Sequence, residues 1–378
     1  MTTAPSDPIA AVTHADPYAY YAHLRAERPL YHDDRLGLWV ASSGDAVTGV
    51  LTSERCRVRP VAEPVPRALL GSAAGEVFGR LVRMNDGPAH GRMKQAVSAA
   101  VQVLDPGQLA SVSRDRARAL VAALAPADDP ARLTPFAFRV TADVVATTLG
   151  APPDALPHIA QWTDDFVRSL APASGADHVE RGTRAAGELL RFIRSLQPTS
   201  DVLRALAGHA PGESEAVVAN AVGFLSQAYE ATAGLIGNTL LALARDPELR
   251  GAVPAVVLEV LRHDPPVQNT RRFVTDDGAV GGVHMRAGDA VLVVLAAANR
   301  DPAYNTEPDR FDVMRAAPRV FTFGIGPHAC PGTTFATTIA AAAVQALLAS
   351  GLKLKGLAET VRYRPSVNTR IPLFGSVA

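Results

Sequence analysis

The chain contains 378 residues, of which 48% are hydrophobic and 20% are charged, and 37 basic residues balance 37 acidic ones. This composition is ample for one large core or two modest domains, and the net charge of zero gives no reason to expect nucleic acid or an anionic membrane as a partner. The two cysteines, Cys56 and Cys330, lie far apart, which argues against a metal finger or a disulfide framework and fits a reducing compartment. Residues 1–17 contain no basic region followed by an apolar core, so we expect no signal peptide, no membrane anchor and a cytoplasmic location.

Apolar residues recur at helical spacing along most of the chain, which predicts a mainly helical protein. In chain order, helices are expected at 17–28, 89–104, 107–125, 136–149, 155–170, 178–196, 199–208, 214–245, 247–263 and 333–350. Short strands are expected at 38–41, 279–283 and 290–295, the second one weakened by Gly281 and Gly282. Proline-rich stretches at 60–66 and 152–157 indicate loops between helices. The β portion is therefore small and divided between the two ends of the chain.

The run from Ser214 to Ala244 is long and apolar, so one interpretation is a transmembrane helix. Polar residues argue against it, because Asn220, Gln227, Glu230 and Asn238 recur through its middle. At about 1.5 Å per residue, a helix of this length would cross a whole domain. We therefore expect a long internal helix.

A cysteine lies in a glycine-rich loop, Phe323–Gly332, just before an alanine-rich helical run. The backbone N–H groups and the positive dipole end of that helix favour a thiolate at Cys330. Gly324 and Gly326 allow the backbone to approach a large flat group, and His328 can donate to a carboxylate on that group. These features together are typical of the proximal side of a haem, whereas the alternative is a buried free cysteine in a turn.

The pattern F-G-x-G-x-H-x-C-x-G resembles the signature of the cytochromes P450, which are haem-thiolate oxygenases. All six fixed positions match, and they are Phe323, Gly324, Gly326, His328, Cys330 and Gly332. The resemblance implies one triangular domain over residues 1–378, mainly α with small β-sheets, in which a long central helix runs over the haem. It also implies haem b (iron protoporphyrin IX) as cofactor, with Cys330 as the axial ligand and Phe323, Gly324, His328 and Gly332 at the cofactor.

Two further segments are similar to the family's haem-propionate motifs. Residues 84–94 resemble D-x-P-x-H-x-x-x-R, which implies that His90 and Lys94 share a helix face and bind a propionate. The family usually has arginine at the second position, and lysine offers a point charge without a bidentate fork. Arg272 matches the family's other propionate partner, and its neighbour Arg271 should face the opposite way in an extended segment.

Glu259 and Arg262 form an E-x-x-R pair, whose residues share one helix face. An exposed ion pair worth about 0–1 kcal/mol is the alternative, but the neighbouring residues are apolar. By resemblance we expect a buried network that fixes the proximal scaffold without catalysing anything. Arg310 is the expected third member, with Arg315 as the second choice.

The distal helix departs from the family pattern A-G-x-E/D-T-T over residues 227–238. Glu230 keeps the acid position, while Ala231 stands where the family has the alcohol. Thr232 is one residue further and rotated by about 100° around the helix, so it could take over only through a local bulge. Gln227 brings an amide towards the pocket, so we expect Glu230, Thr232 and Gln227 to be the catalytic candidates. Protons could come through water held by Gln227 or Thr232, from a substrate hydroxyl, or not at all.

The resemblance implies a monooxygenase that oxidises a small organic molecule with O2, in the manner of enzymes of secondary metabolism. Electrons would come from a ferredoxin and its ferredoxin reductase, or from a flavodoxin-type donor, because the chain ends soon after the haem-binding region. The missing alcohol leaves two alternatives, a peroxygenase or coupling enzyme and a haem- or ligand-binding module without turnover. Substrate contacts are expected from the 60–80 loop, the 160–185 helices, the distal helix, and residues 267–270 and 366–369.

Overall fold

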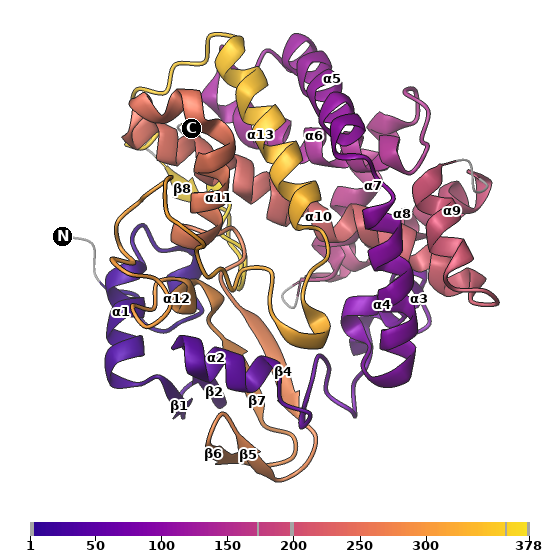
Figure 1. Cartoon of the computed structure of the whole chain (residues 1–378). Helices are drawn as coiled ribbons and strands as arrows, with labels where there is room; N and C mark the ends of the chain where they lie inside the picture. Colours follow the sequence, from indigo (N-terminus) through magenta and orange to yellow (C-terminus); the bar gives the residue numbers. More distant parts are fainter. Residues whose placement is uncertain (1–3, 172–173, 197–199, 360, 376–378) are drawn as a thin grey trace.

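The computed structural model describes residues 4–171, 174–196, 200–359 and 361–375. Helices dominate these residues, and the small sheets gather towards one side of the molecule (Figure 1). The prediction of a mainly helical fold with a small β portion is therefore confirmed. None of the helices in the described part of the chain is long and apolar enough to span a bilayer.

The α-helices match most of the predicted positions and add three short ones. They are α1 (Tyr18–Glu27), α2 (Gly44–Leu51), α3 (Ala73–Arg80), α4 (Gly87–Gln102), α5 (Pro106–Leu124), α6 (Leu133–Thr148), α7 (Leu156–Ser169), α8 (Ala176–Ser195), α9 (Asp201–Gly208), α10 (Ser214–Arg245), α11 (Val253–His263), α12 (Leu295–Asn299) and α13 (Thr333–Ala349). The additions are α2, α3 and α12. Residue 199, where one predicted helix begins, lies outside the described residues.

Short 3₁₀ turns connect several of these helices. They are η1 (Ala10–Thr13), η2 (Arg67–Leu69), η3 (Val82–Met84), η4 (Pro130–Arg132), η5 (Pro247–Ala252) and η6 (Gly326–His328). The single helix expected at 247–263 is thus a 3₁₀ turn followed by α11, and proline occupies the first turn of each. Proline suits that position because its missing N–H would have no helical partner there.

Five strands form the main sheet in the order β1-β2-β7-β4-β3. They are β1 (Leu30–Asp33), β2 (Leu38–Ala41), β3 (Cys56–Arg57), β4 (Thr270–Val274) and β7 (Ala290–Val293), and only the β2–β7 pair is parallel. Two hairpins stand apart: β5 (Gly278–Val280) with β6 (Val283–Met285), and β8 (Arg362–Tyr363) with β9 (Pro372–Leu373). The strand predicted at 279–283 is wrong, because Gly281 and Gly282 take positive φ values of 58° and 83° and turn the chain into the first hairpin.

The long helix α10 lies at the centre of the helical part and packs against α6, α13, α11, α3, α8 and α7. Gly234 permits a close approach, since a Cβ there would lie 2.8 Å from the Pro266 Cβ. One turn later, Asn238 donates to the Asp264 carbonyl at 2.9 Å. The segment after α11 is thereby fixed against α10, as expected for a long internal helix.

A buried ion pair holds the segment that precedes the cysteine loop. Arg262, fully buried, donates to both carboxylate oxygens of Glu259, at 2.6 and 3.0 Å. Arg262 also donates to the carbonyls of Pro308 and Arg310, and Glu259 accepts from the Asp312 amide at 3.0 Å. The pair therefore ties α11 to the segment that leads to Cys330.

The prediction that Arg310 is the third member of this network is wrong. The Arg310 side chain is 63% exposed and reaches only Glu307, at 3.5 Å. Arg315 is the third cation instead, because its Nε lies 3.7 Å from the Glu259 carboxylate and its side chain is only 12% exposed. Only the backbone carbonyl of Arg310 joins the network, as an acceptor for both Arg262 and Arg315.

Candidate functional site

The cysteine loop forms a tight turn before α13. The Cys330 amide donates to the Phe323 carbonyl at 2.7 Å, and Gly324 and Gly326 take positive φ values of 68° and 69°. The Cys330 side chain is exposed, and its sulfur accepts a hydrogen bond from the Gly332 amide at 3.3 Å. The loop thus presents an accessible sulfur on a tight turn whose two glycines at positive φ carry no side chain.

Two side chains of α4, Lys94 and His90, lie beside this loop. Lys94 donates to the carbonyl of Ala329, the residue before the cysteine. His90 is buried, and its ring lies 4.1 Å from the ring of His328, centroid to centroid. Burial, together with the positive charges of His328 and Lys94, lowers the pKa of His90 to about 4. The structure therefore brings together three residues predicted to bind propionates.

His328 has a carboxylate partner within the protein. Its Nε2 lies 2.9 Å from an oxygen of Asp86, whose other oxygen accepts from the Val58 amide at 3.1 Å. Although burial alone would raise the pKa of Asp86, these hydrogen bonds lower it below its usual value. Asp86 thus holds His328 against α4, a contact that the sequence motif did not predict.

Arg272 and Arg271 face opposite ways, as expected in strand β4. Arg272 is 7% exposed, whereas Arg271 is exposed. Arg272 donates to its neighbour's carbonyl at 2.8 Å and contacts the Thr270 hydroxyl at 3.5 Å, and among the described residues no carboxylate pairs with it. A buried guanidinium without an anion is costly, and burial lowers its pKa. Arg272 is therefore suited to pair with a carboxylate of a bound cofactor.

A stripe of accessible residues follows one face of the otherwise buried middle of α10. Phe224, Gln227, Ala228 and Ala231 are partly exposed, at the three- and four-residue spacing of one helix face. Thr232 is 1% exposed and lies off that face, and the helix is regular α throughout, without the bulge that would turn Thr232 into line. The structure thus places Gln227 on the accessible face and Thr232 outside it.

Glu230, the predicted proton-delivery acid, is held by an arginine from the C-terminal part of the chain. The Arg364 guanidinium donates to the Glu230 carboxylate at 2.9 Å. Burial raises the pKa of Glu230, and Arg364 opposes that rise. Sequence reasoning missed Arg364 because it lies beyond β8, far along the chain and outside any motif.

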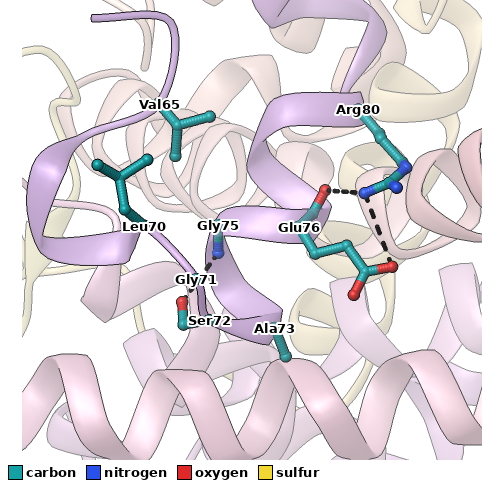
Figure 2. A pocket seen from close by; sticks show the side chains of 8 residues that line it. All are labelled: Val65, Leu70, Gly71, Ser72, Ala73, Gly75, Glu76 and Arg80. Atoms are coloured by element: carbon teal, nitrogen blue, oxygen red, sulfur yellow. Dashed lines mark hydrogen bonds and ion pairs between the residues drawn. The ribbon is translucent and has the colours of Figure 1, made fainter.

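A pocket of about 600 Å³ lies on a different part of the molecule, in the loop and helix before α4 (Figure 2). Val65, Leu70 and Ser72 line it, and Arg80 reaches Glu76 at 3.7 Å on its rim. It belongs to the 60–80 region predicted to contact substrate. None of its lining residues is a predicted haem contact, so it is separate from the cysteine loop.

The residues present fit a haem. The donor set is one accessible sulfur, a glycine-rich turn beneath it, and the cations Lys94 and Arg272, together with His90 and His328, for carboxylates at its edge. Helix α4 and the η3 turn before it connect the two sides of this space, because Lys94 donates to the Ala329 carbonyl of the cysteine loop and the Val82 amide donates to Asn220 of α10. The cysteine loop and the accessible face of α10 therefore border one space, which we call the central space.

Comparison with known proteins agrees with this geometry. Residues 252–350 match the cytochrome P450 family. The chain is 30% identical over 350 residues to the 20-oxo-5-O-mycaminosyltylactone 23-monooxygenase of Streptomyces fradiae, covering 87% of this chain and 81% of that protein. It is 32% identical over 308 residues to the vitamin D(3) 25-hydroxylase of Pseudonocardia autotrophica, covering 75% and 74%.

Solved structures extend the likeness over nearly the whole fold. The crystal structure of P450BioI in complex with an acyl carrier protein superposes with a TM-score of 0.81 at 25% identity, covering 94% of this chain and 96% of that one. The crystal structure of CalO2 gives the same TM-score at 26% identity, covering 99% and 98%. The chain belongs to the cytochrome P450 family. It is a haem-thiolate oxidoreductase of the monooxygenase type, and its relatives include enzymes named as monooxygenases and hydroxylases.

Proposed function

We propose that this P450 binds haem b in the central space, with Cys330 as the axial ligand, and oxidises a small organic molecule there. The observation that carries the proposal is the exposed Cys330 sulfur, which accepts a hydrogen bond from the Gly332 amide in a loop that Lys94 of α4 contacts. When bound, a thiolate-ligated haem supplies the oxygen-activating chemistry, because the sulfur donates electron density to the iron. We also propose that residues 1–378 form one domain and that the enzyme works in the cytoplasm.

The propionates would be held from two sides. Lys94 and His90 approach from α4, and Arg272 approaches from β4. His328 reaches the same edge from the cysteine loop while keeping its contact with Asp86. Because Lys94 and Arg272 are cations without a carboxylate partner among the described residues, a propionate would remove a desolvation cost that each now carries.

Proton supply is assigned to Glu230. Its raised pKa lets the carboxyl group hold a proton nearer to neutral pH than an exposed glutamate does, and Arg364 fixes its position. Gln227 lies on the accessible face of the same helix, where its amide can hold a water between Glu230 and the substrate. Thr232 remains a candidate by sequence alone, since its buried position supports no role at the central space.

A ferredoxin with its reductase, or a flavodoxin-type donor, is the proposed source of electrons. A second candidate function is turnover with peroxide or a coupling reaction that needs no such relay. The observation in its favour is that Ala231, at the accessible position, carries no hydroxyl.

The decisive experiment is the absorbance of the haem-loaded, reduced protein under carbon monoxide. We expect the red-shifted band of a thiolate-ligated haem, lost in Cys330→Ala and kept in Cys56→Ala, whose cysteine is buried with Val274 and Val291 of the main sheet. An unshifted band in the unaltered protein would refute thiolate ligation. Product formation with ferredoxin, reductase and O2 then favours the monooxygenase, whereas brisk turnover with peroxide alone favours the second candidate.

A further inference from the structure

Arg83 is a cation beside the central space that the proposed function leaves without a task. It sits in η3, between α3 and α4. Its side chain is exposed, and the negative charges of Cys330 and Glu230 act on its guanidinium. Within the described residues, no carboxylate, carbonyl or aromatic ring contacts it. Its guanidinium is therefore available to an anion from outside the protein.

The backbone that carries Arg83 is rigidly mounted against α10. Asn220 of α10 accepts from the Val82 amide at 2.8 Å and donates to the Arg80 carbonyl at 2.8 Å. Asn85 donates to the carbonyls of Gly79 and Leu81 at 2.9 and 2.8 Å, which closes the turn on its other side. The position of Arg83 beside the distal helix is therefore set by the fold, and only its side chain is free to reorient.

The charges around Arg83 pair off without it. Arg364 holds Glu230, and Asp86 holds His328. The two haem propionates of the proposed function are matched by Lys94 and Arg272. Cys330, as a ligand, would share its charge with the iron. Arg83, whose turn is hydrogen-bonded to α10, is thus left without an anion from the described residues or from the proposed cofactor.

We propose that Arg83 binds an anionic group of the substrate, so that this P450 acts on an organic acid whose carboxylate lies against η3 while its apolar part reaches the accessible face of α10. The planar guanidinium can hold a carboxylate through two parallel hydrogen bonds, which fixes orientation as well as position. The face formed by Phe224, Ala228 and Ala231 offers apolar contact for the rest of the molecule. This inference rests on the proposed function, because it places the substrate above a haem.

The test compares unbranched carboxylic acids of 6 to 16 carbons with their neutral primary amides. Binding to the haem-loaded protein is measured by titration calorimetry and by the shift of the haem absorbance. At one or more chain lengths, the acid should bind about 10- to 100-fold more tightly than its amide, as expected for hydrogen bonds to a charged group. Arg83→Gln should abolish that preference, and Arg83→Lys should retain part of it.

Arg80→Gln is the matched control, because Arg80 lies one turn earlier on the same segment and points to Glu76 at the outer pocket (Figure 2). It should leave the preference intact. The proposal is overturned if no acid binds better than its amide, or if Arg83→Gln keeps the preference. It is also overturned if Arg83→Gln lowers haem retention alone, since Arg83 would then be a propionate partner. The carbon monoxide band separates these outcomes from a failure of the proposed function, because that band must persist in Arg83→Gln.

Discussion

Removing the carboxylate of Glu259 should destabilise the protein more than removing the side chain of Arg315 or of Arg310. Glu259→Ala leaves the fully buried Arg262 guanidinium without its two hydrogen bonds of 2.6 and 3.0 Å, which should cost about 3–5 kcal/mol. Arg315→Ala should cost about 1–2 kcal/mol, because its charged group donates to backbone carbonyls at 2.5 and 3.1 Å. Arg310→Ala should cost less than about 0.5 kcal/mol, since its ion pair is exposed.

Urea unfolding followed by circular dichroism, with and without haem, measures all three free energies. Glu259→Gln is a milder companion variant, because its amide oxygen still accepts from Arg262 while its charge is gone. We expect it to fall between the alanine variants of Glu259 and Arg315, and to lose haem more readily as the segment before Cys330 loosens. A larger loss for Arg310→Ala than for Arg315→Ala would refute the assignment of the third cation.

Three further outcomes follow from the site. Ala231→Thr should raise the fraction of electrons that end in product by about two- to tenfold in a ferredoxin-driven assay, while Thr232→Val should leave it unchanged; no gain in the first would refute the relay argument. The pKa of His90 falls from 6.5 to about 4 on folding, so the unfolded chain binds more protons than the folded chain between those pH values. This residue should therefore lower the free energy of unfolding of the haem-free protein by about 2 kcal/mol at pH 5 relative to pH 7. His90→Asn should remove that difference. Arg272→Leu should weaken haem affinity about 10- to 100-fold and Arg271→Leu should not, as measured by haem transfer to apomyoglobin.

The sequence predicted the long elements well because their signals are local and periodic. The bounds of α10 and β2 were predicted at 214–245 and 38–41, the former from a long, mainly apolar run at helical spacing. Helix α3 was not predicted because two of its eight residues are glycines, which have low helix propensity. It forms because Ser72 caps it and because Gly75 packs where a Cβ would lie 2.0 Å from the Leu69 carbonyl oxygen.

Partners that come from distant segments could not be predicted. The segment around Arg310 and Arg315 has no periodicity, so spacing alone could not tell which arginine folds back onto Glu259. Arg364 meets Glu230 only because β8 approaches α10 in the folded chain. Motif matching named the residues of the cysteine loop and of α4 and favoured Arg272 over Arg271. Strand alternation predicted that these two arginines face opposite ways, which the structure confirms.

Under the proposed function, the ion pair between Arg364 and Glu230 ties substrate selection to proton supply. Arg364 precedes the turn at residues 366–369, which is expected to contact substrate, and its amide donates to the Ile371 carbonyl across the base of that turn. An engineer who remodels the turn for a bulkier compound will therefore also displace the cation that fixes the acid. Variants with altered substrate selectivity should therefore lose a larger share of their electrons to reactions that form no product, unless Arg364 is kept in place.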